Sequence, residues 1–169
     1  KPTFAMTLWL VNASSVDHYR LAGADVAGLV ENMMTLAGKG ALTLTTRTPV
    51  NLRRARTCYD HLAGELAVDI YQFLLREAWI TPDGSAVTPA GEAHFSRLGM
   101  VLTGEGRRKA CCACLDWSER RFHAGGIVGA ALLQHGQQQG WFVLTPGFRE
   151  VSVSAEGKRA LARHFQLPL

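Results

Sequence analysis

Apolar and polar residues first alternate along the chain and then change to a helical spacing. The alternation covers residues 8–21 and surrounds a run of turn-forming residues at 12–15, so it predicts a β-hairpin. From Asp25 the pattern becomes the i, i+3, i+4, i+7 spacing of an amphipathic helix, which Gly38 can end. The apolar positions of this helix are Val26, Leu29, Val30 and Met33.

A change of composition follows this helix. Residues 39–51 are rich in glycine and threonine and include Pro49, so we interpret them as a linker. Asn51 can cap a helix whose first turns carry Arg53, Arg54 and Arg56. We expect this helix to continue into the next segment or to bend at Gly64.

The second half of the chain contains the same pattern twice. Residues 61–79 align without a gap onto residues 123–141, with histidine first, glycine fourth and tryptophan last in both. Each copy is followed by a segment that can cap and start a short helix, at residues 87–91 and 153–157. Duplicated segments usually adopt duplicated structures, and this one predicts a helix, a hairpin and a second helix.

The second copy has its own predicted helix start. Asp116 and Glu119 have the spacing of a capping box, which predicts a helix beginning near Trp117. Together these patterns predict a mainly α protein with small β-hairpins (α+β), built from tandem winged-helix-like units. We place the first unit at residues 52–101 and the second unit at residues 102–169.

Composition sets limits on function more than on fold. The chain has 169 residues, 47% hydrophobic and 19% charged, which is ordinary for a globular protein of one domain or two small ones. No apolar run is long enough to cross a bilayer, so we do not expect a membrane partner. The net charge of +4 permits contact with nucleic acid, and we regard Arg53, Arg54 and Arg56 as candidate DNA-binding residues.

The cysteines provide the main candidate chemistry. Three thiols within four residues, Cys111, Cys112 and Cys114, could converge on a soft metal ion, with His123 as a further ligand. The alternative is that they are small buried apolar side chains. Their irregular spacing indicates a reducing, cytoplasmic compartment without disulfides.

A second group of residues could form an effector pocket. His61 and His123 occupy equivalent places in the two copies and could face one another; the alternative is that each packs at a helix start and bonds to backbone or to a neighbouring acid such as Asp60. Trp117 and Arg120 could line a small pocket, and the Trp117 ring could stack on a guanidinium group. No spaced nucleophile and base, phosphate loop or zinc-protease motif is present, so we expect no enzyme, no catalytic residue and no required cofactor.

Two strings of residues carry a family resemblance. Residues 56–64 (RTCYDHLAG) and residues 114–126 (CLDWSERRFHAGG) resemble the C-terminal region of bacterial ArsR-type winged-helix transcriptional regulators. Residues 19–22 (YRLA) are similar to the end of that family's wing and the start of its dimerisation helix. By this resemblance, residues 1–38 are a residual wing hairpin and dimerisation helix, and an N-terminal helix-turn-helix is missing or truncated.

The resemblance implies a function. It points to the regulatory and dimerisation portion of a cytoplasmic transcriptional repressor, which is a homodimer, responds to an effector and binds double-stranded DNA through the full-length protein. The alternative is a thiol-based metal or redox sensor module without direct DNA binding. An enzyme using Cys114 and His123 is the least favoured interpretation.

Overall fold

The computed structural model describes residues 48–104 and 108–168, with shorter stretches before them. In the N-terminal part, β1 (Val11–Ala13) and β2 (Val16–His18) pair antiparallel, which confirms the predicted hairpin. The described positions of the predicted amphipathic helix are helical; they are Val26, Leu29, Val30, Asn32, Met33 and Leu36. Residues 1–10, 19–22 and most of the predicted linker lie outside the described residues.

Apart from a short helix at its start, the remainder of the chain contains a similar order of elements twice. The first unit comprises α2 (Val50–Arg54), β3 (Arg56–Cys58), β4 (His61–Ala63), α3 (Glu65–Arg76) and α4 (Pro89–Arg97). The second comprises β5 (Cys112–Leu115), β6 (Phe122–Gly125), α5 (Gly126–Gln138), β7 (Phe142–Leu144), β8 (Val151–Val153) and α6 (Ala155–Phe165). Apart from α2, which begins the first unit, each unit consists of a hairpin, a helix, a second hairpin and a second helix. In the first unit a single bridge between Ile80 and Val87 takes the place of the β7–β8 hairpin. The mixed α+β fold with small hairpins is confirmed.

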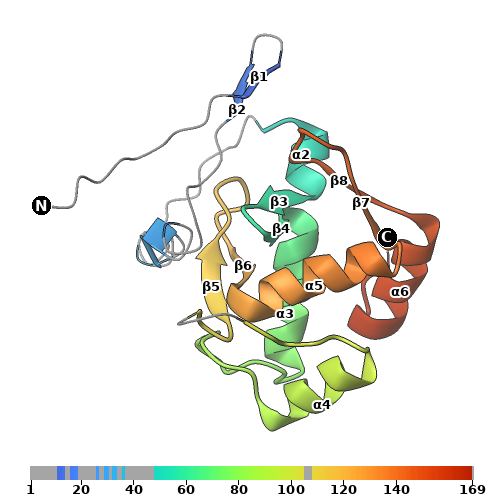
Figure 1. The fold of residues 1–169 in the computed structure, drawn as a ribbon. Coiled ribbons are helices and arrows are strands. Elements are labelled where there is room, and N and C mark those ends of the chain that lie inside the picture. Colours follow the sequence, from blue (N-terminus) through green and yellow to red (C-terminus); the bar gives the residue numbers. More distant parts are fainter. Residues whose placement is uncertain are drawn as a thin grey trace, which may run out of the picture.

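The first long helix of each unit packs on the first hairpin of the other unit. Helix α3 of the first unit packs on β6 of the second, and α5 of the second unit packs on β4 of the first. Figure 1 shows α3 and α5 crossing at the centre of the molecule, with α4 and α6 at its periphery. Buried side chains from both units form a single hydrophobic core, which includes Trp79 and Trp141. This packing brings the hairpins β3–β4 and β5–β6 together at the junction of the two units.

The helix starts predicted after each tryptophan are confirmed. Thr88 caps α4 by accepting a hydrogen bond from the Gly91 N–H at 3.0 Å, and Ser154 caps α6 by accepting from the Gly157 N–H at 2.9 Å. Such caps satisfy backbone donors that a helix leaves without an internal partner. The segments at residues 87–91 and 153–157 are thus equivalent in structure as well as in sequence.

The helix predicted from Asn51 is wrong in its extent. Helix α2 has Pro49 at its N-cap and ends at Arg54, and Arg56 begins a strand. The chain becomes extended here because the second unit supplies backbone partners: the Thr57 N–H donates to the Arg149 carbonyl at 2.7 Å. Residue spacing within the first unit carries no sign of these partners.

The helix predicted near Trp117 is also wrong, because α5 begins nine residues later at Gly126. Asp116 does accept from the Glu119 N–H at 3.1 Å, as a capping box requires. The Asp116 N–H, however, donates to the Arg121 carbonyl at 2.8 Å, which closes the β5–β6 hairpin instead. Arg120 has a φ of 54°, and this left-handed conformation ends the helical turn.

Candidate functional site

The candidate site lies where the hairpins β3–β4 and β5–β6 meet. Cys58 on β3 pairs in register with His61 on β4, and Cys114 on β5 pairs with His123 on β6. Each hairpin therefore presents one thiol and one imidazole as cross-strand neighbours, which is a spacing at which side chains touch. The duplication places one such pair in each unit.

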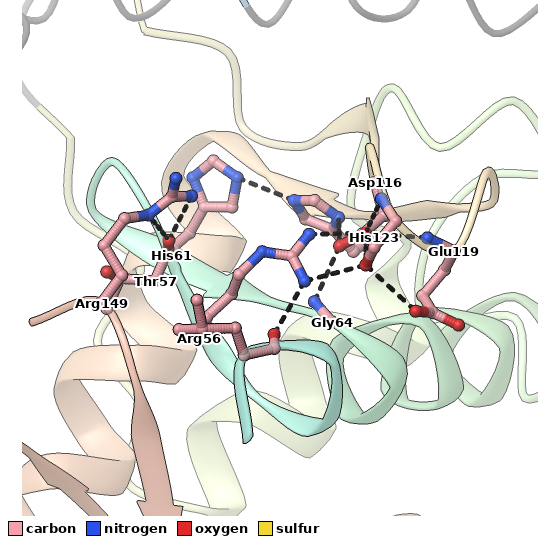
Figure 2. Close-up of polar contacts among 10 residues, drawn as sticks. Arg56, Thr57, His61, Gly64, Asp116, Glu119, His123 and Arg149 are labelled. Atoms are coloured by element: carbon pink, nitrogen blue, oxygen red, sulfur yellow. Dashed lines mark hydrogen bonds and ion pairs between the residues drawn. The ribbon is translucent and has the colours of Figure 1, made fainter. Parts of the chain in front are cut away.

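These four side chains converge on one point. One ligand atom from each of Cys58, His61, Cys114 and His123 lies within 4.8 Å of the other three. The Nε2 atoms of the two histidines are 3.2 Å apart, and Figure 2 shows the two rings facing one another. Both histidines and Cys114 are buried, while Cys58 is half-buried. Two thiols and two imidazoles in this arrangement are able to hold a metal ion.

A carboxylate lies behind each histidine. The Nδ1 of His61 is 3.3 Å from Oδ1 of Asp60, and the Nδ1 of His123 is 3.4 Å from Oδ2 of Asp116. Carboxylates in this position favour a proton on Nδ1 and leave the lone pair on Nε2, as second-shell groups do for metal-bound histidines. Asp116 also accepts the Gly64 N–H at 2.7 Å, which fixes its side chain.

An arginine from the opposite unit holds each carboxylate. Arg56 of the first unit donates to Asp116 at 2.6 Å, with both side chains almost fully buried. Arg108 of the second unit contacts both carboxylate oxygens of Asp60, at 2.6 and 2.9 Å. On each side of the cluster, an arginine therefore contacts an aspartate, and that aspartate contacts a histidine. Figure 2 shows this chain of contacts for Arg56, Asp116 and His123. Both ion pairs cross the junction between the units.

The cluster shifts the pKa values of its acids. Burial alone would raise the pKa of Asp116, but contacts with His123, the Gly64 N–H and Arg56 hold it well below its usual range. The same balance of burial against His61 and Arg108 lowers the pKa of Asp60. Contact with Cys114 lowers the pKa of Cys58 to about 2, despite its burial. The site thus favours charged carboxylates and a thiolate.

The structure brings together only part of the predicted metal site. Cys114 and His123 belong to the cluster, whereas Cys111 and Cys112 do not. Cys112 pairs in register with Gly125, two residues along β6 from His123. Cys111 precedes β5 and is fully enclosed in the core.

We expect Cys111 to be alkylated only when the protein unfolds. Burial raises the pKa of its thiol to about 12, so the reactive thiolate is scarce at neutral pH, and the side chain has no exposed surface. Mass spectrometry after iodoacetamide treatment of the native protein should find Cys111 unmodified. Treatment in denaturant serves as the control and should modify all four cysteines. Rapid native modification of Cys111 would contradict the burial shown here.

The other predicted site residues take different places. His61 joins His123 in the cluster, and Trp117 lies under the Arg56 guanidinium, whose Cζ is 4.5 Å from the ring centre. Stacking of Trp117 on a guanidinium was one of the sequence-based expectations; Arg120 occupies the turn that closes the hairpin. Arg53 and Arg54 are half-exposed and pair with Glu65 on α3. Arg56 is enclosed, so its side chain is not at the surface.

Cys58, Asp60 and Arg108 are not among the predicted site residues; the sequence suggests Cys58 only as a thiol that the fold could recruit, and Asp60 only as a neighbour of His61. The sequence does contain a signal for Cys58 and Asp60. In both units a cysteine is followed two positions later by an aspartate, and a histidine further along is followed three positions later by a glycine. In the first unit the histidine follows Asp60 directly, whereas six residues separate Asp116 from His123. An ungapped alignment of the copies begins at the histidines and therefore leaves the cysteines out.

Comparison with known proteins gives one informative match. The chain is 32% identical over 158 residues to an uncharacterized HTH-type transcriptional regulator, YdfF, of Bacillus subtilis (strain 168). The match covers 90% of this chain and 70% of the relative. No family model matches the chain, and no solved structure matches it. Within the described residues, no helix combines the length and apolar character needed to cross a membrane.

Proposed function

Since this chain belongs to the HTH-type transcriptional regulators, we propose that it is the regulatory and dimerisation portion of an ArsR-type repressor that responds to an effector. The observation that carries the proposal is the similarity to a regulator of this class over nine-tenths of the chain. The two strings at residues 56–64 and 114–126, which resemble ArsR-type proteins, support the finer assignment. A regulatory relative also favours a non-enzymatic role.

The amphipathic helix supports a homodimer. Its described apolar positions are exposed: Leu29 and Met33 are each 60% exposed, and Leu36 is 67% exposed. A row of exposed apolar side chains at helical spacing suits a partner helix, because pairing would remove that surface from water. A second copy of the chain is the occupant we propose, since operators read by such regulators are palindromic.

Binding of the full-length protein to duplex DNA tests the function. We expect a gel shift on duplexes from the upstream region of its own gene, with an affinity that falls steeply as salt rises, because phosphate contacts release counterions. Arg53 and Arg54 are proposed phosphate contacts, so replacing either with alanine should reduce the salt slope by about one. Absence of salt-sensitive duplex binding would reject the repressor and leave the thiol-based sensor module, which the cysteine–histidine cluster favours.

The oligomeric state is measured on the same protein. Light scattering coupled to size exclusion should give the mass of a dimer for the wild type. Leu29→Glu combined with Met33→Glu should give a monomer. Val143→Glu is the matched control, because Val143 is an exposed apolar residue on β7 and not on the helix proposed as the interface, so this variant should remain dimeric. A monomeric wild type would contradict the proposed dimer.

A further inference from the structure

We propose that Cys58, His61, Cys114 and His123 form a tetrahedral Zn²⁺ site that fastens the two units of the duplication to one another. The site goes beyond the proposed regulatory function and does not depend on DNA binding. It also differs from the cluster of neighbouring cysteines that the sequence indicated, since it takes two ligands from each unit.

The distances fit a tetrahedral zinc ion. Zn–N bonds of about 2.0–2.1 Å separate two histidine nitrogens of a tetrahedron by about 3.3 Å, and Zn–S bonds of about 2.3 Å separate two sulfurs by about 3.8 Å. The Nε2 atoms of His61 and His123 are 3.2 Å apart, and all four ligand atoms lie within 4.8 Å of one another. Adjustments of less than about 1 Å would therefore complete the tetrahedron.

The histidine geometry suits a cation between the rings. Asp60 and Asp116 face the two Nδ1 atoms, at 3.3 and 3.4 Å, so the lone pairs on both Nε2 atoms point into the site. Without a metal ion, the two Nε2 atoms, 3.2 Å apart, are close enough for a proton on one to be donated to the other, so the same spacing serves a hydrogen bond or a shared cation. A bound metal ion satisfies both nitrogens at once, and the carboxylates then act as the outer partners usual for zinc-bound histidine.

The charges also balance around zinc. Two thiolates and two neutral imidazoles neutralise one Zn²⁺, and each aspartate behind them is neutralised by an arginine, Arg56 or Arg108. A buried site without net charge avoids a large desolvation cost. Two sulfur and two nitrogen ligands in a tetrahedron are typical of zinc, whereas hard cations prefer oxygen ligands.

The position of the site indicates a structural role. Four protein ligands leave no open position for a substrate or water, as in structural zinc sites. One cysteine–histidine pair comes from the hairpin on which α5 packs, and the other comes from the hairpin on which α3 packs. Zinc would therefore fix both hairpins, and through them both central helices, so its binding energy becomes folding energy.

Metal titration of the chain, stripped with a chelator, tests the site. We expect one Zn²⁺ per chain by elemental analysis, and with Co²⁺ the visible bands of tetrahedral cobalt together with thiolate charge transfer. Cys58→Ser should weaken affinity by more than about 100-fold, because even an outer partner contributes about 10–100-fold. Asp60→Asn, which changes an outer partner of His61, should weaken zinc affinity by only about 10–100-fold. Zinc should also raise the denaturation midpoint of the wild type, and Cys58→Ser should not respond.

Cys112→Ser is the matched control, because Cys112 is a neighbouring thiol on β5 outside the cluster. This variant should keep the cobalt spectrum and the stoichiometry. Circular dichroism identifies variants that fail to fold, and Cys58 was chosen because it is the half-buried ligand. The site is rejected if the folded wild type binds no zinc, or if Cys112→Ser loses the cobalt spectrum while Cys58→Ser retains it. Zinc binding without DNA binding would reject only the repressor function.

Discussion

Replacing Asp116 with asparagine is expected to lower the free energy of unfolding by about 3–5 kcal/mol, the usual cost of removing one partner from a buried ion pair. Arg56 and Asp116 are 1% and 0% exposed, so the guanidinium left behind would have no access to water. Asp116 also accepts hydrogen bonds from the backbone N–H groups of Gly64 and Ser118. The substitution preserves volume and therefore isolates the loss of charge. Denaturant unfolding followed by circular dichroism measures the effect.

The control for this prediction is an exposed ion pair of the same chain. Glu156 pairs with Arg159 at 2.5 Å, but the two side chains are 58% and 65% exposed. Glu156→Gln should therefore change the free energy of unfolding by less than about 1 kcal/mol, as surface pairs do. Equal effects of the two substitutions would show that the Arg56–Asp116 pair is not enclosed as described.

A second large loss of stability is expected from substitution of the glycine in the first turn of α4 or of α6, because each glycine lies against the backbone of the preceding tryptophan. A Cβ added to Gly157 would lie 2.3 Å from the Trp141 carbonyl oxygen, and one added to Gly91 would lie 2.0 Å from that of Trp79. Both distances are far below van der Waals contact, and the obstructing atoms are backbone atoms that cannot rotate away. Gly157→Ala and Gly91→Ala should each lower the free energy of unfolding by about 3 kcal/mol, the upper end of overpacking costs.

Gly147 supplies the comparison for this pair. It lies in the turn between β7 and β8, and a Cβ added there meets nothing within 4 Å, although its φ is +80°. Gly147→Ala should therefore cost only the strain of a left-handed alanine, about 1 kcal/mol. If Gly157→Ala were as mild as Gly147→Ala in the same unfolding measurement, the close approach of α6 to Trp141 would be wrong.

Local patterns were sufficient for much of the fold. The helices after the tryptophans follow from threonine or serine caps and from apolar spacing, and the buried tryptophans follow from their place after apolar helical faces. These features depend on neighbours within a few residues, which a sequence displays directly. The two incorrect helices, from Asn51 and near Trp117, have a different origin. Their backbone groups form hydrogen bonds that the helical pattern does not indicate. The Thr57 N–H donates to the Arg149 carbonyl, and the Asp116 N–H donates to the Arg121 carbonyl.

The duplication, the short helices with small hairpins and the equivalence of His61 and His123 can all be inferred from residue patterns alone. The identity of the thiols that join these histidines depends on how the two units pack together. Cys58 and Cys114 meet because α3 and α5 each pack on the hairpin of the other unit. Residues more than fifty positions apart are brought together by burial of apolar surface, which specifies a shared core but leaves no local spacing to identify the polar partners.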